Sequence, residues 1–526
     1  VELLIAKRDG LISGAEADSR IEALKNTDVR RDIDRYMYRN SLNQQHSLNL
    51  SGGTENQTFF VSAGYDRNLQ NLVANSYGRL SLNGSNTYRF LKQKLQLTTG
   101  IYYIQSKQVL NNAGPGSMMM DLASPVYPYA RLADDQGNPL SVIRDYRAGY
   151  LQNAAVQVPG LLDWTYNPIR EIELGDNKIN GIDYRINANI QYKLPAGFDA
   201  SLLYQYGKTT DNSRNLQGID TYYTRNLINS LTSVVSPGTL VRPVPVGGIL
   251  DLNTMNAQSH NLRAQLNYNR VWKDMHRITA LAGAEVQDRS MISNSSRLYG
   301  YDDLHASSLP VDHITPFTIL FNPNRTSTIP AAGQMSELTD RYLSWYMNGA
   351  YTLKNKYTLT ASGRFDKSNL FGVRTNQKGV PLWSAGLAYN LSDESFYKIS
   401  YLPYLKLRLS YGYNGNVNRS LSAYTTARYV SAAFLTRIPY ASVSNPPNPE
   451  LRWERIKMVN AGIDLSSAGN VLGGSIDFFS KKGFDLIGET PFPPSSGITR
   501  FRGNTAGIRG NGIDIALNSR NIDRKF

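Results

Sequence analysis

The stretch Tyr184-Arg-Ile-Asn-Ala-Asn-Ile-Gln-Tyr192 alternates without a break between two kinds of side chain. Its even positions carry Tyr, Ile, Ala, Ile and Tyr, and its odd positions carry Arg, Asn, Asn and Gln. Successive side chains of a β-strand point to opposite faces, so this alternation predicts a strand with one apolar and one polar face.

The same alternation recurs along the whole chain. It is strong in residues 261–269, 357–366 and 405–412. Weaker copies lie near 46–51, 59–65, 77–83, 95–103, 200–206, 278–287, 343–351, 383–390, 457–465, 472–479 and 512–518. The pattern predicts about fifteen strands, and we find no fixed-period repeat or low-complexity linker that would divide the chain into several domains.

Short and long connections alternate between these strands. Turns rich in Gly, Asn, Pro or Asp are expected at 51–58, 193–199, 270–277, 352–356 and 466–471. Long segments fill 104–183, 207–260, 288–342, 412–456 and 480–511. Outer-membrane barrels have short turns on the periplasmic side and long extracellular loops, whereas compact soluble domains rarely contain long irregular loops. The sequence therefore favours an all-β transmembrane antiparallel β-barrel over a soluble all-β protein, which also alternates when one face covers a core.

Composition agrees with a barrel wall. The 526 residues include 34 tyrosines, five tryptophans and no cysteine, and the mean hydropathy is −0.39. No apolar run is long enough for a membrane-spanning helix, since even the segment 117–133 is broken by Asp and Pro. The absence of cysteine excludes disulfides, thiol nucleophiles and zinc fingers. Tyrosines expected in the interfacial girdles of the barrel are Tyr65, Tyr103, Tyr192, Tyr268, Tyr351 and Tyr411.

The formal net charge of +14 arises from scattered Lys and Arg residues. No block of five or six basic residues occurs, so nucleic-acid binding is not expected. The chain begins Val-Glu-Leu-Leu, without a Met or a signal peptide, which indicates either a mature product or a fragment.

Residues 11–40 differ from the rest, because their apolar positions recur at helical spacing. Asp18 or Ser19 is the expected N-cap, and Asn26-Thr27-Asp28 is expected to interrupt the helix. If Leu48-Asn-Leu50 leads into a periplasmic turn, this segment lies outside the cell.

Enzyme signatures are missing from the sequence. It has no Walker A run, no Gly-x-Gly-x-x-Gly, no Gly-x-Ser-x-Gly and no His-Glu-x-x-His. We expect no enzyme, no catalytic residue, no resident metal and no cofactor, and no substrate-binding residue can be assigned. His305 and His313 lie beside acidic residues, but their spacing follows no metal-site rule, and whether the acidic loop residues bind calcium stays open. The acidic residues are Asp302, Asp303 and Asp312.

One loop segment is unusually apolar and aromatic. Met118-Met-Met120 is followed by Pro125, Tyr127, Pro128 and Tyr129. Such a patch either packs within an ordered loop or contacts a ligand or partner protein.

Particular motifs resemble the SusC/RagA-type TonB-dependent transporters of Bacteroidetes outer membranes. The most specific is Asn448-Pro-Glu-Leu-Arg-Trp-Glu454, followed by Asn460-Ala-Gly-Ile-Asp464 and Ser475-Ile-Asp-Phe-Phe479. Leu407-Arg-Leu-Ser-Tyr-Gly-Tyr-Asn-Gly-Asn416 is similar to a strand end of the family. Further matches are Gly363-Arg-Phe-Asp-Lys-Ser-Asn369, Leu382-Trp-Ser-Ala-Gly386, Asp393-Glu394, Leu50-Ser-Gly-Gly53, Ala63-Gly-Tyr65, Gly503-Asn504 and Asn511-Gly-Ile-Asp514. Two departures, Pro381-Leu-Trp383 and Tyr389, fall in the expected wall.

The resemblance implies a 22-stranded barrel, a preceding plug domain and a TonB-contacting segment. About fifteen strands cannot close such a barrel, and unpaired edges are costly in hydrocarbon. Residues 1–526 are thus expected to be one partial barrel domain from the middle of a longer protein, with neither the plug nor the last strands, so that Phe526 reflects truncation.

The resemblance also implies the function. The implied function is TonB-dependent active import of oligosaccharides or peptides across the outer membrane. The implied partners are a SusD-like surface lipoprotein that acts as a lid, TonB as the energy-coupling protein, and outer-membrane lipid around the wall. A dimer of SusC–SusD-like pairs is also possible. The polar faces would anchor the plug and line the route, or simply be solvated in the lumen. These polar residues are Arg185, Asn187, Asn189, Arg263, Gln265, Asn267, Lys406 and Arg408. The positive charge would favour anionic cargo or pair with an acidic plug. A passive porin or structural barrel, and a secreted β-rich carbohydrate-binding or hydrolytic protein, are the competing hypotheses.

Overall fold

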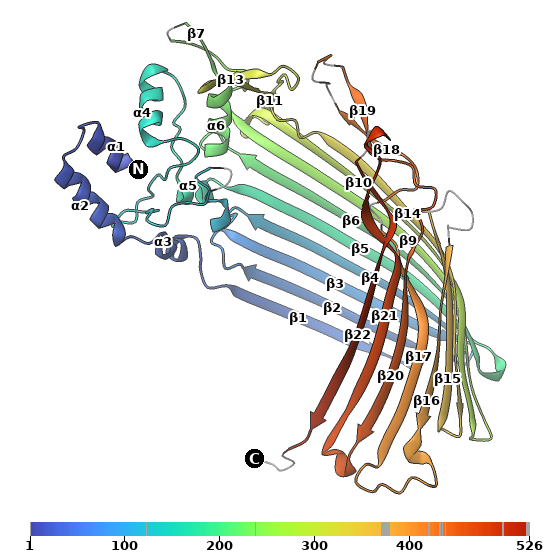
Figure 1. The fold of residues 1–526 in the computed structure, drawn as a ribbon. Coiled ribbons are helices and arrows are strands. Elements are labelled where there is room, and N and C mark those ends of the chain that lie inside the picture. The colour runs from blue at the N-terminus through green and yellow to red at the C-terminus, as the bar shows by residue number, and fades with distance from the viewer. Residues whose placement is uncertain are drawn as a thin grey trace.

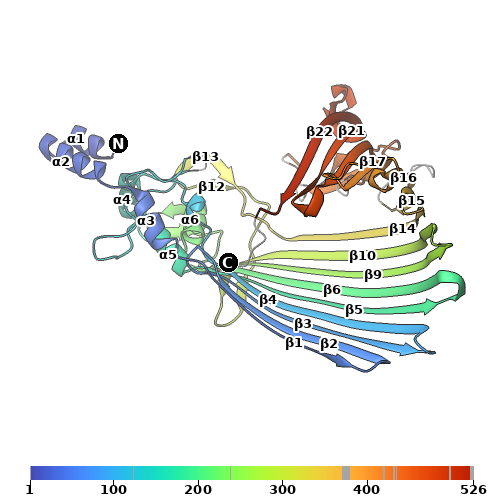
Figure 2. The same ribbon diagram turned by 90° about the horizontal axis from the view of Figure 1, so that it is seen from below.

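The alternating segments form long strands that pair in chain order (Figure 1). The computed structural model describes residues 2–121, 124–236, 238–369, 379–418, 421–430, 433, 435–436, 438–496 and 499–521. Fifteen antiparallel strands run in the order β1 to β6, β9, β10, β14 to β17 and β20 to β22, with β11 added beside β10. Figure 2 shows the sheet curving from β1 through β10 to β22 around an open interior. The predicted all-β fold and its number of strands are confirmed.

The strands of the main sheet are β1 (Leu42–Gly53), β2 (Gln57–Leu69), β3 (Asn75–Phe90), β4 (Leu95–Leu110), β5 (Asp176–Lys193), β6 (Phe198–Gln217), β9 (Gly248–Trp272), β10 (His276–Asp302), β11 (Ser307–Leu309), β14 (Gln334–Leu353), β15 (Tyr357–Ser368), β16 (Gly379–Asn390), β17 (Tyr404–Asn416), β20 (Glu454–Ser466), β21 (Leu472–Pro491) and β22 (Arg500–Ser519). Three separate hairpins are β7 (Ser233–Ser236) with β8 (Thr239–Val241), β12 (Phe317–Ile319) with β13 (Asn322–Ser327), and β18 (Thr426–Val430) with β19 (Tyr440–Asn445). The helices are α1 (Glu2–Arg8), α2 (Gly14–Lys25), α3 (Val29–Tyr36), α4 (Ala148–Gln157), α5 (Pro168–Glu173) and α6 (Tyr222–Leu231), and the 3-10 turns are η1 (Pro115–Ser117), η2 (Pro195–Gly197), η4 (Leu391–Asp393), η5 (Ala468–Asn470) and η6 (Pro494–Ser496).

The strand register gives the wall one apolar and one polar face. Ile186 lies opposite Ile101 on one side and Tyr206 on the other, while the adjacent Asn187 lies opposite Gly100 and Gln205. Cross-strand partners share a face, so apolar residues meet apolar residues across the sheet. The apolar face is uncovered: Leu387 is 58% exposed and Ile513 is 64% exposed. A face of this kind requires lipid rather than water.

Aromatic residues mark the upper and lower edges of the apolar face. Tyr184 and Tyr192 on β5, Phe198 and Tyr206 on β6, and Tyr357 and Phe365 on β15 each lie eight residues apart on that face. Eight residues span about 26 Å along a strand, or about 20 Å across the membrane at a tilt near 40°. That height is close to the apolar band of roughly 25 Å in outer-membrane barrels. All six predicted girdle tyrosines lie on this face.

The strands extend far into the segments predicted as long loops. The connection expected at 104–183 contains only residues 111–175, and that expected at 207–260 contains 218–247, which holds β7 and β8. The boundaries of the loops predicted at 207–260 and 288–342 were wrong because part of the loop-end half of β9 and β10 is polar on both faces, as at Asn253, Thr254 and Asn294. The alternation disappears there while the strands continue, and at the loop ends of the two strands Ile249, Leu250 and Tyr299 are buried. The longer connections still lie at one end of the wall and the shorter turns at the other (Figure 1).

The N-terminal segment forms three helices at the end of the long loops (Figure 2). The predicted interruption at residues 26–28 is confirmed, because it separates α2 from α3. The predicted N-cap at Asp18 or Ser19 is wrong: Ser13 caps α2, its Oγ accepting a 3.1 Å hydrogen bond from the amide of Glu16. Asp18 instead lies in mid-helix and accepts a hydrogen bond from Lys7.

In the part of the chain that the structure describes, no helix has both the length and the apolar character needed to cross a bilayer.

Candidate functional site

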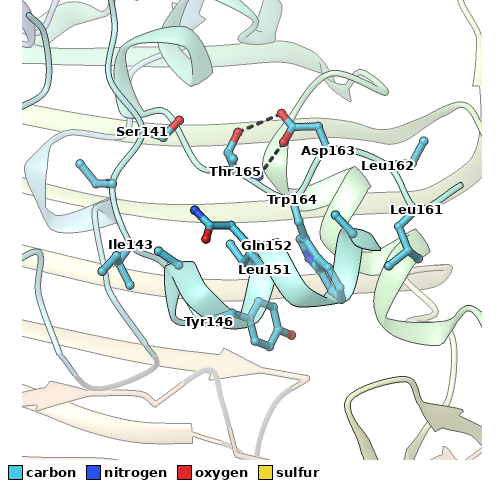
Figure 3. Close-up of a pocket in the computed structure, with 13 residues that line it drawn as sticks. Ser141, Ile143, Tyr146, Leu151, Gln152, Leu161, Leu162, Asp163, Trp164 and Thr165 are labelled. Atoms are coloured by element: carbon cyan, nitrogen blue, oxygen red, sulfur yellow. Dashed lines mark hydrogen bonds between the residues drawn. The ribbon is translucent and has the colours of Figure 1, made fainter. Parts of the chain in front are cut away.

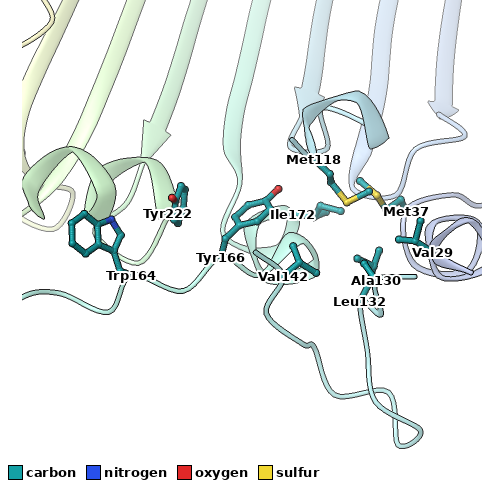
Figure 4. Close-up of a cluster of buried hydrophobic side chains, with 10 residues drawn as sticks. All are labelled: Val29, Met37, Met118, Ala130, Leu132, Val142, Trp164, Tyr166, Ile172 and Tyr222. Atoms are coloured by element: carbon teal, nitrogen blue, oxygen red, sulfur yellow. The ribbon is translucent and has the colours of Figure 1, made fainter. Parts of the chain in front are cut away.

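The described loop residues form three hydrophobic clusters, and the cluster in Figure 4 joins α3 and Tyr222 to the connection between β4 and β5. The largest contribution comes from the connection between β4 and β5, residues 111–175. The buried residues of this cluster are Val29, Met37, Met118, Ala130, Leu132, Val142, Trp164, Tyr166, Ile172 and Tyr222. Burial of these side chains holds residues 111–175, α3 and α6 together as one ordered loop cluster.

Two buried asparagines fasten this loop cluster to the sheet. The Asn75 side chain donates a 2.8 Å hydrogen bond to the carbonyl of Asn112 and accepts one of 2.9 Å from its amide. Asn112 Nδ2 donates to the carbonyl of Met37 at 3.1 Å, and its Oδ1 accepts from the amide of Gly114 at 2.9 Å. Every polar atom of the Asn112 side chain is therefore used in tying α3 and residues 111–175 to the start of β3. We call this network the asparagine clasp.

A cavity of about 370 Å³ opens beside α4 (Figure 3). Aromatic rings stand at its edge: Tyr146 packs against Trp164 with 5.0 Å between ring centroids and against Phe321 with 4.4 Å. The indole Nε1 of Trp164 donates a 2.8 Å hydrogen bond to Asn226 Oδ1, which fixes the ring. The remaining lining is mainly aliphatic, with Leu151, Ala155 and Leu161 among its members. Such a cavity suits an apolar or ring-shaped group.

A second cavity of about 380 Å³ shares Ser141, Leu162, Asp163 and Thr165 with the first. Charged residues line this part: Arg225 donates 2.8 Å and 2.6 Å hydrogen bonds to the carboxylate and the carbonyl of Asp163. We call the two adjoining cavities the loop cleft.

Glu171 also lines the charged part, where its carboxylate accepts a 2.8 Å hydrogen bond from the amide of Tyr222. Burial raises the pKa of Glu171, although the Tyr222 amide and Arg225 oppose that shift. The loop cleft thus presents aromatic faces at one end and both signs of charge at the other. This arrangement can bind an amphipathic ligand through stacking, hydrogen bonds and ion pairs.

The predicted lumen residues all lie on the polar face of the wall, where several are held by neighbours. Arg185 pairs with Asp183 at 3.2 Å, and Arg263 pairs with Glu285 at 2.9 Å. Asn267 and Gln265 are joined at 2.7 Å, and Gln265 also accepts from the hydroxyl of Tyr346 at 2.9 Å. These contacts give the face a structural network in addition to any role toward a plug.

Arg408 contacts carboxylates on two neighbouring strands of this face. Its guanidinium donates to both oxygens of Asp464, at 2.9 Å and 2.7 Å, and reaches Asp477 at 3.0 Å. The three residues lie on β17, β20 and β21, so one side chain links three adjacent strands.

The histidines and acidic residues singled out as metal candidates do not converge on one site. His305 pairs with Asp302 three residues away, whereas His313 bonds to the carbonyl of Ile329 at 3.1 Å. Asp312 binds the hydroxyl and amide of Thr315. Among the described residues, no group of three or more His, Asp or Glu side chains is placed to hold a metal ion.

The methionine-rich segment packs within its own loop, as one of the two hypotheses predicted. Met118 is buried in the shared core, and Tyr127 packs against that core. Tyr129 remains 45% exposed at the surface.

Sequence reasoning did not single out Trp164, Arg225 or Asn112. The loop cleft joins segments some sixty residues apart, as in the contacts from residue 163 to 225 and from 164 to 226. The run Asn111-Asn-Ala-Gly-Pro115 does carry turn chemistry, but nothing in it indicates Asn75 or Met37 as partners.

Residues 124–523 match the protein family described as "TonB dependent receptor-like, beta-barrel". TonB-dependent receptor P39 of Formosa agariphila is 27% identical over 484 residues, which are 91% of this chain and 41% of the relative. TonB-dependent receptor SusC of Bacteroides thetaiotaomicron is 22% identical over 530 residues, which are 95% of this chain and 46% of the relative.

Among solved structures, the RagAB peptide importer in its closed-closed state matches with a TM-score of 0.72 at 17% identity, covering 95% of this chain and 50% of that one. The RagAB likeness shows a shared fold. The chain spans half or less of the length of each of these relatives.

Proposed function

Because this chain belongs to the TonB dependent receptor-like β-barrel family of outer-membrane proteins, we propose that it supplies the wall and the ligand-contacting loops of an energised importer. The observation that carries the proposal is the position of the loop cleft, which lies in ordered loops at the end of a wall with a polar inner face. A ligand held there is presented to the entrance of the barrel.

The proposed cargo is an oligosaccharide or a peptide. Both classes combine ring or apolar faces with polar groups, and the loop cleft offers the matching pair of surfaces. Sugar and apolar side-chain faces stack on the ring of Tyr146, which the buried Trp164 supports from behind, while Arg225, Asp163 and Glu171 provide hydrogen bonds and charge. No bond of the cargo is broken in this process.

The proposed machinery has further parts. A SusD-like surface lipoprotein closes over the loops as a lid, and TonB draws on the inner-membrane proton gradient to displace a plug. Support comes from relatives named TonB-dependent receptors and from the resemblance to the SusC/RagA type. The polar face that carries Arg263 and Arg408 surrounds the space in which such a plug would sit.

The test uses the full-length protein in its native outer membrane and two neighbouring substitutions on α4. Ala155→Trp fills the loop cleft, whereas Val156→Trp adds the same ring at a position that is 79% exposed. Uptake of labelled oligosaccharides and of labelled peptides is measured with and without TonB.

We expect uptake of one cargo class to need TonB, to fall at least tenfold in Ala155→Trp and to persist in Val156→Trp. Uptake that is independent of TonB would contradict the proposal and favour the passive porin. Recovery of the protein in the aqueous phase after detergent partitioning would favour the secreted β-rich protein.

A further inference from the structure

Three basic residues stand side by side on the apolar, outward face near the loop end of the wall. Lys457 on β20 lies directly opposite Lys482 on β21, and Lys482 lies directly opposite Arg509 on β22. The same row continues through Tyr413 to Trp383 on the other side. We call Lys457, Lys482 and Arg509 the cationic row.

Like charges directly opposite one another destabilise a sheet, because their Cβ atoms are only about 5 Å apart. No ion pair with a described residue balances these three charges. Lys457 lies over the ring of Tyr411, 5.1 Å from its centroid, and both Lys482 and Arg509 are exposed. Asp485, a carboxylate farther along β21, is already held by Arg452 and Arg455 at 2.6 Å each. The cationic row is therefore a repulsive arrangement that an external anion would relieve.

The position of the row indicates the kind of anion. Two residues toward the membrane lies a neutral row of Val459, Ser480 and Asn511, and two residues further lies an apolar row of Ala461, Phe478 and Ile513. Phe478 and Ile513 are 48% and 64% exposed. The charges thus stand about 13 Å along the strands from uncovered apolar side chains on the same face. An anion bound there would be amphipathic, with its charge uppermost.

We propose that the cationic row binds the phosphate groups of a phosphorylated lipid of the outer leaflet, whose acyl chains lie against Phe478 and Ile513. Trp383 and Tyr413 in the same row suit the interface between headgroups and hydrocarbon. Basic residues at this depth attract anionic lipid headgroups. The proposal requires only that the wall lies in the outer membrane, and it does not depend on which cargo is imported.

The test uses the full-length protein, purified from outer membranes and delipidated in mild detergent. It is titrated with a bisphosphorylated, acylated glucosamine disaccharide, with the dephosphorylated form of that lipid, and with inorganic phosphate, while bound lipid is counted by native mass spectrometry. The variants are K457Q, K482Q and R509Q, singly and combined. The matched control is K481Q, which removes an exposed charge from the adjacent residue on the opposite face.

We expect the phosphorylated lipid to bind the wild-type protein and the K481Q variant equally. If each basic residue contributes roughly a factor of five, the triple variant binds on the order of a hundredfold more weakly. The single variants, each about fivefold weaker, serve if the triple variant does not fold. Equal binding of the dephosphorylated lipid, equal binding by the triple variant, or displacement by inorganic phosphate at the lipid's concentration would each overturn the proposal.

Discussion

The asparagine clasp gives a sharp test of how the loop cleft is held. In Asn112→Ala the hydrogen bonds between the backbone of residue 112 and the Asn75 side chain remain, but the amide of Gly114 loses its acceptor. The carbonyl of Met37 loses one donor and keeps the 2.9 Å bond from the amide of Val73. A buried donor without a partner costs about 1–3 kcal/mol and a lost hydrogen bond about 1 kcal/mol, so the variant should weaken the loop cluster by about 3 kcal/mol.

The barrel wall should not be affected, because it does not include these bonds. If opening of the loop cluster costs about 3 kcal/mol less, the amides that exchange only through this opening exchange roughly 150-fold faster. Hydrogen exchange on the folded protein should therefore accelerate at the amides of Met37, Val73 and Gly114 and stay unchanged within β15 to β17. Gln136→Ala, an exposed change in the same connection, is the control. Exchange at Met37 that rises less than threefold would refute the reasoning, as would equal acceleration in the wall.

Three further predictions concern the loop cleft and the two faces of the wall. Burial raises the pKa of Glu171 above its ordinary 4.5, so the ionised carboxylate opposes loop order at neutral pH. This cost decreases as the pH falls through the raised pKa and is absent below 4.5. Protection of the Tyr222 amide, corrected for intrinsic exchange, should therefore increase from pH 7 to 4.5, and Glu171→Gln should abolish the trend. Arg408→Ala leaves two carboxylates without their partner and should lower stability by about 1–2 kcal/mol in thermal unfolding, whereas Lys406→Ala, which removes no ion pair among described residues, should have no effect. Leu359→Arg on the lipid face should cost about 2–4 kcal/mol for unfolding from vesicles, and its neighbour Thr360→Arg on the polar face, which lies opposite the uncharged Ala350 and Gly386, less than about 1 kcal/mol.

The wall could be predicted from the sequence because each strand faces lipid on one side and water on the other, so that apolar and polar residues alternate along it. Tyr184–Tyr192 shows this directly, and the pattern also gave the number of strands. The prediction ended where the pattern ended: in the loop-end parts of β9 and β10 both faces carry polar residues, such as Asn253, Thr254 and Asn294, so these stretches look like loop in the sequence. Local hydrogen bonds decided the N-cap of α2, and Ser13 was missed because Asp18 and Ser19 are equally good capping residues.

The loop cleft could not be predicted in the same way. Its contacts join positions far apart in the chain, such as Trp164 with Asn226 and Asn112 with Met37. A single sequence carries no signal for such pairs unless the fold is known. The polar wall residues were placed on the right face, yet the ion pairs of Arg263 and Arg408 depend on a register that alternation alone does not set.

Apart from β10, which also pairs with β11, each described strand of the wall pairs only with its neighbours in the strand order, and the loop cleft is built outside that pairing. Residues 111–175 leave the sheet after β4 and return at β5, so their internal sequence leaves the β4–β5 register untouched. The architecture separates two design tasks, one for insertion into lipid and one for recognition. A graft of a foreign 111–175 segment, with Asn112 retained as its anchor, is therefore a rational route to a barrel with altered selectivity.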